Sequence, residues 1–144
     1  MQEITKVNHI GIRVSSLKKA KDFYQKLGFD FITGPSGPEP VAILLHPSGI
    51  NINLILNASD RPSHNVLMDD PIKYTGYTHV ALEVTNMASV LEQLTLLELI
   101  PSSGPTRHPT GISVFFRDDD NNVIELIEYA GLEGLETNTV DNLD

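Results

Sequence analysis

The sequence predicts an α+β fold made of two copies of one β-α-β-β-β unit. Residues 7–14 (VNHIGIRV) and 77–84 (YTHVALEV) share a pattern at an offset of seventy. The similarity continues into the segments that follow, where the matched apolar positions are Leu17, Ala20, Tyr24 and Leu27 in the first copy and Met87, Val90, Leu94 and Leu97 in the second. A repeat of this length is typical of a duplicated supersecondary unit.

Each copy alternates between the periodicities of strands and helices. In the first copy, β-branched residues with a period of two predict a strand, and the next segment has the cap and the apolar spacing of a helix that ends at Gly28. Short apolar runs separated by turn residues predict three more strands. The predicted elements are a strand at 7–14, a helix from Ser15 or Ser16 to about Lys26, and strands at 29–33, 41–45 and 50–56, with a turn or loop at 34–38.

The second copy repeats this order after a linker at about 58–75, which has no clear period. Its predicted elements are a strand at 78–84, a helix at 87–97 capped near Asn86, a strand around Leu99, a loop at 102–109, and strands at 112–117 and 123–129 joined by a turn at 118–122. We therefore expect one domain over residues 1–129, with modules at about 5–57 and 76–129. An acidic, flexible tail is expected at 130–144.

Composition excludes several classes of partner and ligand. The chain has no cysteine, so any metal must be held by nitrogen and oxygen. Ten basic and nineteen acidic side chains give a net charge of −9, which argues against binding to nucleic acid. No segment approaches the roughly 20 apolar residues of a membrane span or has the pattern of a signal peptide, so we expect a cytoplasmic protein without a membrane partner.

Three side chains predict a metal site. His9 and His79 open equivalent strands of the two copies, so a pseudo-twofold arrangement would bring two imidazoles together. Glu125 interrupts an apolar strand, where a buried carboxylate is costly unless its charge is compensated; Glu128 is the better candidate for a surface position. Two imidazoles and a carboxylate suit a divalent ion as a facial triad. The alternatives are ordinary strand-end histidines and a solvent-facing Glu125.

The chain resembles the vicinal oxygen chelate superfamily, which includes glyoxalase I, extradiol dioxygenases and bleomycin-resistance proteins. The resemblance covers residues 7–129 and rests on HIGIRV, AKDFY and LGF in the first copy, HVAL in the second, and the turn and strand at 118–125. It implies two tandem βαβββ modules whose curved mixed sheets form a cleft, and a metal held by the first and fourth strands of each module. Carried over by position, the ligands would be His9, His79 and Glu125. The implied ion is nickel, zinc, iron(II) or manganese, and the implied assembly is a homodimer.

Two further residues bear on the chemistry, and they favour different classes of enzyme. Asn53 aligns with Glu125, at a position where glyoxalase I has a glutamate, and its short amide makes the ligand set more similar to the His, His, Glu of extradiol dioxygenases. Arg13 instead matches the arginine by which glyoxalase I is thought to hold a carboxylate of glutathione, although a surface salt bridge is its alternative. We expect both Asn53 and Arg13 to bind substrate.

The predicted activity is that of a divalent-metal-dependent lyase or isomerase of glyoxalase type. Its substrate would be a small, oxygen-chelating anion, and Glu125 would also move a proton as the catalytic residue. An iron(II) extradiol-type dioxygenase is one alternative, and a metal-free drug-binding resistance protein is another, against which the triad argues. The remaining histidines, His46, His64 and His108, lie beside turn signals and are expected to be solvated, with His108 alone able to reach the mouth of the cleft.

Overall fold

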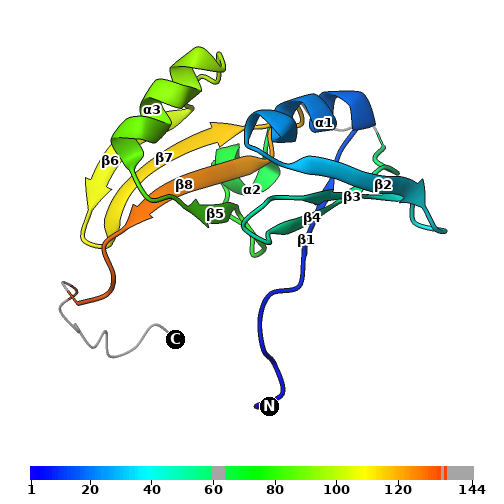
Figure 1. The fold of residues 1–144 in the computed structure, drawn as a ribbon, viewed down its shortest axis with the longest axis horizontal. Coiled ribbons are helices and arrows are strands. Elements are labelled where there is room, and N and C mark those ends of the chain that lie inside the picture. The colour runs from blue at the N-terminus through cyan, green and yellow to red at the C-terminus, as the bar shows by residue number, and fades with distance from the viewer. Residues whose placement is uncertain (60–63, 134, 136–144) are drawn as a thin grey trace. The chain divides into compact units, whose positions relative to one another are not determined.

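The computed structural model describes residues 1–59, 64–133 and 135, and it contains two four-stranded sheets (Figure 1). The chain divides into two compact units. The first contains Met1–Thr78 together with Asp118–Asn122, and the second contains His79–Arg117 and the described residues from Val123 onward. The predicted α+β class and the two βαβββ modules are confirmed.

The sheet of the first unit has the strand order β1-β4-β3-β2. Strand β1 runs parallel to β4, whereas β3 is antiparallel to both of its neighbours. Helix α1 lies over one face of this sheet (Figure 1). The elements are β1 (Ile10–Arg13), α1 (Leu17–Lys26), β2 (Asp30–Ser36), β3 (Val41–Leu45), β4 (Asn51–Ile55) and the short helix α2 (Val66–Asp69).

Helix α1 begins and ends where its caps predict. The Ser16 hydroxyl accepts a hydrogen bond from the backbone N–H of Lys19, and the chain leaves the helix through Gly28, whose φ is +93°. One face of the helix supplies buried side chains to the core of this unit. That core contains Ile12, Val14, Ala20, Phe23, Tyr24, Phe29, Ala42, Leu44, Ile52 and Leu54.

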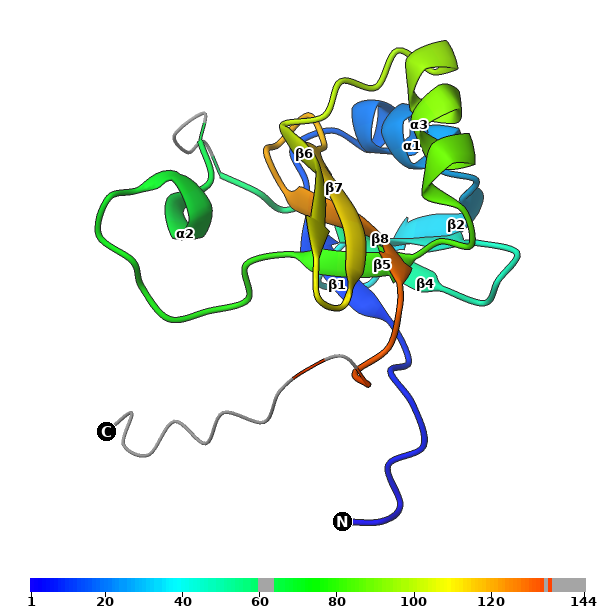
Figure 2. The same cartoon turned by 90° about the vertical axis from the view of Figure 1, so that its left-hand side faces the viewer.

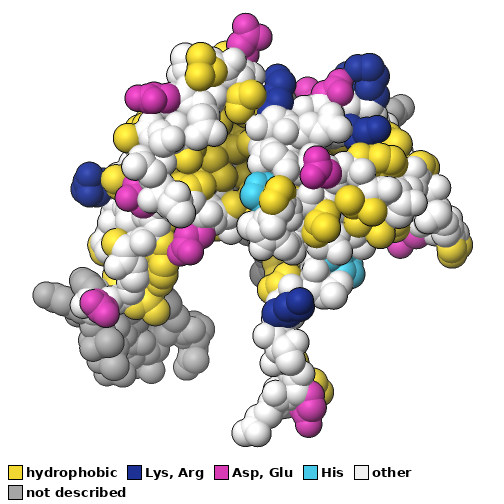
Figure 3. Space-filling view, in the orientation of Figure 1, with side chains coloured by type: hydrophobic (Ala, Val, Ile, Leu, Met, Phe, Trp, Pro, Cys, Tyr) yellow, Lys and Arg dark blue, Asp and Glu magenta, His cyan; other side chains and the backbone are white. Residues whose placement is uncertain are grey.

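The second unit repeats this topology, with the strand order β5-β8-β7-β6 and β5 parallel to β8. Its elements are β5 (Val80–Glu83), α3 (Met87–Leu96), β6 (Ser103–His108), β7 (Gly111–Arg117) and β8 (Val123–Tyr129). Hydrophobic side chains gather between α3 and the strands of this unit (Figure 3). The buried set is Met87, Leu94, Val114, Phe116, Val123, Ile124 and Leu126.

Strand register makes Asn53 and Glu125 structurally equivalent. Asn53 pairs with Gly11 across the parallel β1 and β4, and Glu125 pairs with Ala81 across the parallel β5 and β8. Successive strand residues alternate between the two faces of a sheet. Asn53 therefore lies on the face opposite Ile52 and Leu54, and Glu125 lies on the face opposite Ile124 and Leu126. The duplicated unit therefore places an amide in the first copy where it places a carboxylate in the second.

Two strand predictions around Gly-Pro pairs are wrong. The segment 102–109, predicted as a loop, contains β6, and no strand forms around Leu99; likewise β2 continues to Ser36 through the predicted turn. Both strands lie at a sheet edge, where a residue without an N–H is tolerated, and both show register shifts near Gly34-Pro35 and Gly104-Pro105. Irregular edge strands thus resembled loops in the sequence.

The connection between β4 and β5 contains helix α2, which the sequence did not predict. Figure 2 shows α2 set apart from the strands of the first sheet. Its Asn65 cap accepts hydrogen bonds from the N–H groups of Leu67 and Met68. Most of the predicted acidic tail lies outside the described residues, and within the described ranges no helix has the length and apolar character to cross a membrane.

Candidate metal site

Two of the predicted ligands, His79 and Glu125, lie next to each other in the second unit. His79 immediately precedes β5, and Glu125 is in the middle of the neighbouring strand β8. The Nε2 atom of His79 is 3.0 Å from Oε2 of Glu125. Glu125 is buried, with 9% of its surface exposed, and the His79 ring packs edge-on against Phe115 with 5.5 Å between centroids. A buried carboxylate is therefore paired with an imidazole nitrogen.

The second oxygen of this carboxylate has its own partner. The Ser113 hydroxyl donates to Oε1 of Glu125 at 2.5 Å, and Ser113 is 1% exposed. His108 Nε2 lies 2.6 Å from the Ser113 oxygen, and the Thr110 hydroxyl lies 2.9 Å from His108 Nδ1. A continuous chain of hydrogen bonds thus runs from Thr110 through His108 and Ser113 to Glu125 and His79.

Ser113 was not predicted as a site residue, and His108 was expected to be solvated and able to reach the mouth of the cleft; in the structure both are part of this network. The signal for Ser113 was present: a hydroxyl at the third position of an apolar strand is unusual, and alternation places it on the face of Phe115, which pairs with Glu125. For His108 the signal was hidden, because the strand that carries it was predicted as a loop.

The third proposed ligand, His9, belongs to the first unit. It precedes β1, is exposed, and its Nδ1 is 2.8 Å from the side-chain oxygen of Asn8. Over the ranges that the structure describes, no group of three or more histidine, aspartate or glutamate side chains is arranged to hold a metal by itself. The complete triad of His9, His79 and Glu125 therefore stays a prediction.

The two proposed substrate-binding residues also lie in the first unit. The amide oxygen of Asn53 is buried and has no hydrogen-bond partner, and the same is true of Asn51 on the same face of β4. Arg13 donates to Glu39 at 2.8 Å and to Asn57 at 2.9 Å, and the side chains of Arg13 and Glu39 are 51% and 55% exposed. Asn53 thus lacks a donor, and Arg13 takes part in a surface ion pair.

The donor atoms of the second unit suit a divalent ion. Histidine nitrogen and carboxylate oxygen are ligands of zinc and of the other first-row metals. Carboxylates that bind metals are in turn held by hydrogen bonds, as Ser113 holds Glu125. In the first unit, the oxygen of Asn53, at the position equivalent to Glu125, is buried and has no hydrogen-bond partner.

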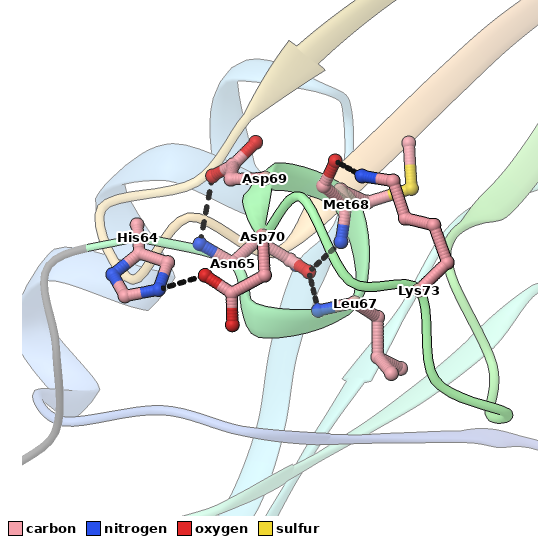
Figure 4. Close-up of polar contacts among 7 residues, drawn as sticks. All are labelled: His64, Asn65, Leu67, Met68, Asp69, Asp70 and Lys73. Atoms are coloured by element: carbon pink, nitrogen blue, oxygen red, sulfur yellow. Dashed lines mark hydrogen bonds and ion pairs between the residues drawn. The ribbon is translucent and has the colours of Figure 1, made fainter.

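His64 instead belongs to a local cluster around α2 (Figure 4). Its Nε2 is 2.8 Å from Asp70, the Asp69 carboxylate accepts from the backbone of Asn65, and Lys73 donates to the carbonyl of Met68. These contacts join the two ends of one short segment. His64 is part-buried, and its contact with Asp70 helps to hold the connection between β4 and β5.

Two tandem βαβββ modules, with a histidine just before the first strand of the second module and a glutamate on its fourth strand, define the class of the fold. Residues 6–126 match the Glyoxalase/Bleomycin resistance protein/Dioxygenase superfamily, and the chain belongs to it. No curated protein matches the sequence.

Solved structures of low sequence identity share the fold. TnmS3, an antibiotic binding protein from a Streptomyces species, is 22% identical with a TM-score of 0.68, over 89% of this chain and 98% of that one. The fosfomycin resistance protein FosX from Listeria monocytogenes is 21% identical with a TM-score of 0.66, over 90% and 95%. A FosX variant complexed with Mn(II) and 1S,2S-dihydroxypropylphosphonic acid is 21% identical with a TM-score of 0.65, over 91% of this chain and 96% of that one.

Proposed function

We propose that this protein is a divalent-metal-dependent vicinal oxygen chelate enzyme, a lyase or isomerase of glyoxalase type. The observation that carries the proposal is the pair of Glu125 and His79, whose Oε2 and Nε2 atoms lie 3.0 Å apart at a buried position. A buried carboxylate is costly unless its charge is compensated, and a divalent cation compensates it. His9, at the position in the first copy that matches His79, is the third ligand of the proposal.

The residues of the chain have distinct proposed roles. His9, His79 and Glu125 would hold nickel, zinc, iron(II) or manganese, and such an ion supplies Lewis-acid polarisation of two neighbouring substrate oxygens when it is bound. Glu125 is also the proposed catalytic residue, because a carboxylate oxygen can accept a proton from a substrate carbon or oxygen and return it. The Ser113 hydroxyl contacts Oε1, so Oε2 is the oxygen that would bind the ion, and it would take up a proton only when it is displaced from the ion.

We propose that the substrate is small and anionic. Arg13 would exchange the Glu39 carboxylate for an anionic group of the substrate, an exchange that costs little because exposed ion pairs contribute only about 0–1 kcal/mol. Asn53 would accept a hydrogen bond from a substrate hydroxyl. The 1S,2S-dihydroxypropylphosphonic acid bound to the FosX variant, which combines adjacent hydroxyls with a phosphonate, supports a substrate of this kind.

A metal-free drug-binding protein is the second candidate. Asn53 in place of a carboxylate favours it, as does the similarity to an antibiotic binding protein. The iron(II) dioxygenase remains the alternative that the His, His, Glu set favours. In each case we expect a cytoplasmic homodimer without nucleic-acid or membrane partners.

The first test is metal content. We expect protein purified without a histidine tag to hold a divalent ion, and His9→Ala, His79→Ala and Glu125→Ala each to lose most of it while keeping the circular dichroism spectrum of the fold. His64→Ala is the matched control, because His64 makes its contact with Asp70 in the α2 segment. Stoichiometric metal in two of the three ligand variants would contradict the triad.

Turnover distinguishes the candidates. Metal-loaded protein would be assayed without oxygen on glutathione hemithioacetals and other small carboxylates, and with oxygen on catechols. Turnover of the carboxylates is expected. Consumption of oxygen with catechols alone would indicate the dioxygenase, and tight binding of an unmodified drug without turnover would indicate the drug-binding protein.

A further inference from the structure

We propose that Ser113 and His108 are positioning residues that hold Oε1 of Glu125 and thereby present Oε2 to His79. The proposal rests on the proposed metal-binding role of Glu125, and it adds two residues to the site. Its basis is the order of the hydrogen bonds: Ser113 contacts Glu125 at 2.5 Å, and His108 contacts Ser113 at 2.6 Å, so Ser113 stands between His108 and Glu125 in the hydrogen-bonded chain.

The direction of each hydrogen bond follows from the number of available protons. A serine hydroxyl has one proton, and an ionised carboxylate has none, so Ser113 donates its proton to Oε1 of Glu125. The serine oxygen can then only accept from His108. His108 must therefore carry its proton on Nε2, which leaves Nδ1 to accept from the Thr110 hydroxyl at 2.9 Å. The network thus fixes one tautomer of His108.

This network restricts the orientation of the carboxylate. The terminal torsion of a glutamate is broad, so an unsupported carboxylate can rotate and exchange its two oxygens. With Oε1 held by Ser113, Oε2 remains opposite Nε2 of His79. Hydrogen bonds to metal-binding groups of this kind typically change metal affinity 10- to 100-fold.

The first copy supplies an internal comparison. Val41 pairs with Ile55 as Ser113 pairs with Ile127, so Val41 is the register equivalent of Ser113. In the same copy, Asn53 takes the place of Glu125. The hydroxyl is therefore present in the copy that has the carboxylate and absent from the copy that lacks it. This is the distribution expected if Ser113 serves Glu125 rather than the sheet.

The experiment measures Mn(II) affinity by calorimetric titration, with circular dichroism melting as the control for folding. We expect Ser113→Ala to weaken Mn(II) binding by about 10- to 100-fold. His108→Leu should also weaken it, although His108 acts on Glu125 through Ser113, and His108→Gln, whose amide N–H can replace Nε2–H, should restore binding. Ser48→Ala is the matched control, because Ser48 and His46 form a similar pair at 2.7 Å in the first unit.

The outcomes separate this proposal from the proposed function. Folded Ser113→Ala with the Mn(II) affinity of the wild type would overturn the positioning role while leaving the metal site intact. If His108→Leu binds Mn(II) with the affinity of the wild type, the role of His108 is overturned. The same comparison tests the positioning role if Ser113→Ala fails to fold. If the wild type and Glu125→Ala bind Mn(II) equally, the proposed function itself is wrong and the positioning role falls with it.

Discussion

At the scale of single residues, Glu125 is notable because each of its two oxygens has a different partner. One oxygen receives the proton of Ser113, and the other lies beside an imidazole nitrogen of His79. The chain could have neutralised this position by burying an amide, as it does at Asn53 in the first copy. A carboxyl group at 9% exposure is what the proposed role of Glu125 in binding a cation or moving a proton requires.

Arg13 gives a prediction at the same scale. Arg13→Ala should weaken the binding of an anionic ligand by about 1.5–3 kcal/mol, the range for hydrogen bonds to charged groups, without changing metal content. Glu39→Gln should strengthen the binding, because it removes the carboxylate that competes for the guanidinium. Titration with a small phosphonate measures both effects. Lys18→Ala, which breaks an exposed ion pair on α1, is the control, and identical affinities for Arg13→Ala and Lys18→Ala would assign Arg13 to the surface.

At the scale of elements, the start of helix α3 is held by two side chains. The Asn86 oxygen accepts from the N–H of Ser89 at 2.9 Å, and the Glu128 carboxylate accepts from the N–H of Met87 at 2.8 Å. The sequence predicted the Asn86 cap, whereas it favoured a surface position for Glu128. A carboxylate at a helix N-terminus both satisfies a free donor and interacts favourably with the helix dipole.

Both contacts should be visible in the free energy of unfolding. Asn86→Ala should lower it by about 1 kcal/mol, and Glu128→Gln by about 0.3–1 kcal/mol, with the second effect decreasing at high salt. Urea unfolding at two salt concentrations measures these changes. Glu92→Gln, at an exposed position farther along α3, serves as the control, and an equal loss for Glu92→Gln and Glu128→Gln would show that the contact contributes nothing.

The elements also show how far the sequence predicts this fold. Strand β8 begins and ends at its predicted residues, and α1 and α3 begin at predicted caps, because periodicity and capping are local signals. Strand β6 was missed because its Gly104-Pro105 pair has the composition of a loop, and its edge position, which tolerates proline, is a property of the assembled sheet. The pairing of β7 with β8 follows from the predicted turn at 118–122, but its register, which pairs Phe115 with Glu125, is not set by the pattern of either strand. The contact of Ser113 with Glu125 depends on that register, whereas His79 and Glu125 were identified as site residues from the repeat and from the apolar strand.

At the scale of the whole molecule, the turn Asp118–Asn122 belongs to the first unit although both flanking strands belong to the second. The buried Asp118 carboxylate accepts from the Tyr24 hydroxyl at 2.9 Å and also from Asp120 and Asn122. Asp120 accepts from the backbone of Ser15, and Asn122 donates to the carbonyl of Arg13. Burial raises the pKa of Asp118. The pKa of Tyr24 is also raised, first by burial and then by the neighbouring Asp118 carboxylate.

The buried pair of Tyr24 and Asp118 should make the stability of the protein depend on pH. Tyr24→Phe should lower the free energy of unfolding by about 1.5–3 kcal/mol, because a hydrogen bond to a charged group is lost. Since the pKa of Asp118 is higher in the folded protein than in the unfolded chain, the folded state binds the proton more tightly. Its contribution to stability therefore falls as the pH rises from the unfolded pKa, about 3.9, through the folded pKa.

Asp118→Asn removes this titration. The difference in unfolding free energy between the wild type and Asp118→Asn should decrease as the pH is raised from 4 to about 7, while other carboxylates contribute equally to both proteins. Urea unfolding at a series of pH values measures it. A difference that stays constant over this range would contradict the assignment to Asp118.

The position of this turn also has a consequence for the duplication itself. In this chain the second segment supplies the acceptor for a phenol that the first segment buries. A polypeptide that stopped at Thr78 would keep the Tyr24 hydroxyl in its core and lose the group that satisfies it. The first half thus depends on the second, and the repeat boundary is not a place where the chain can be divided without loss of stability.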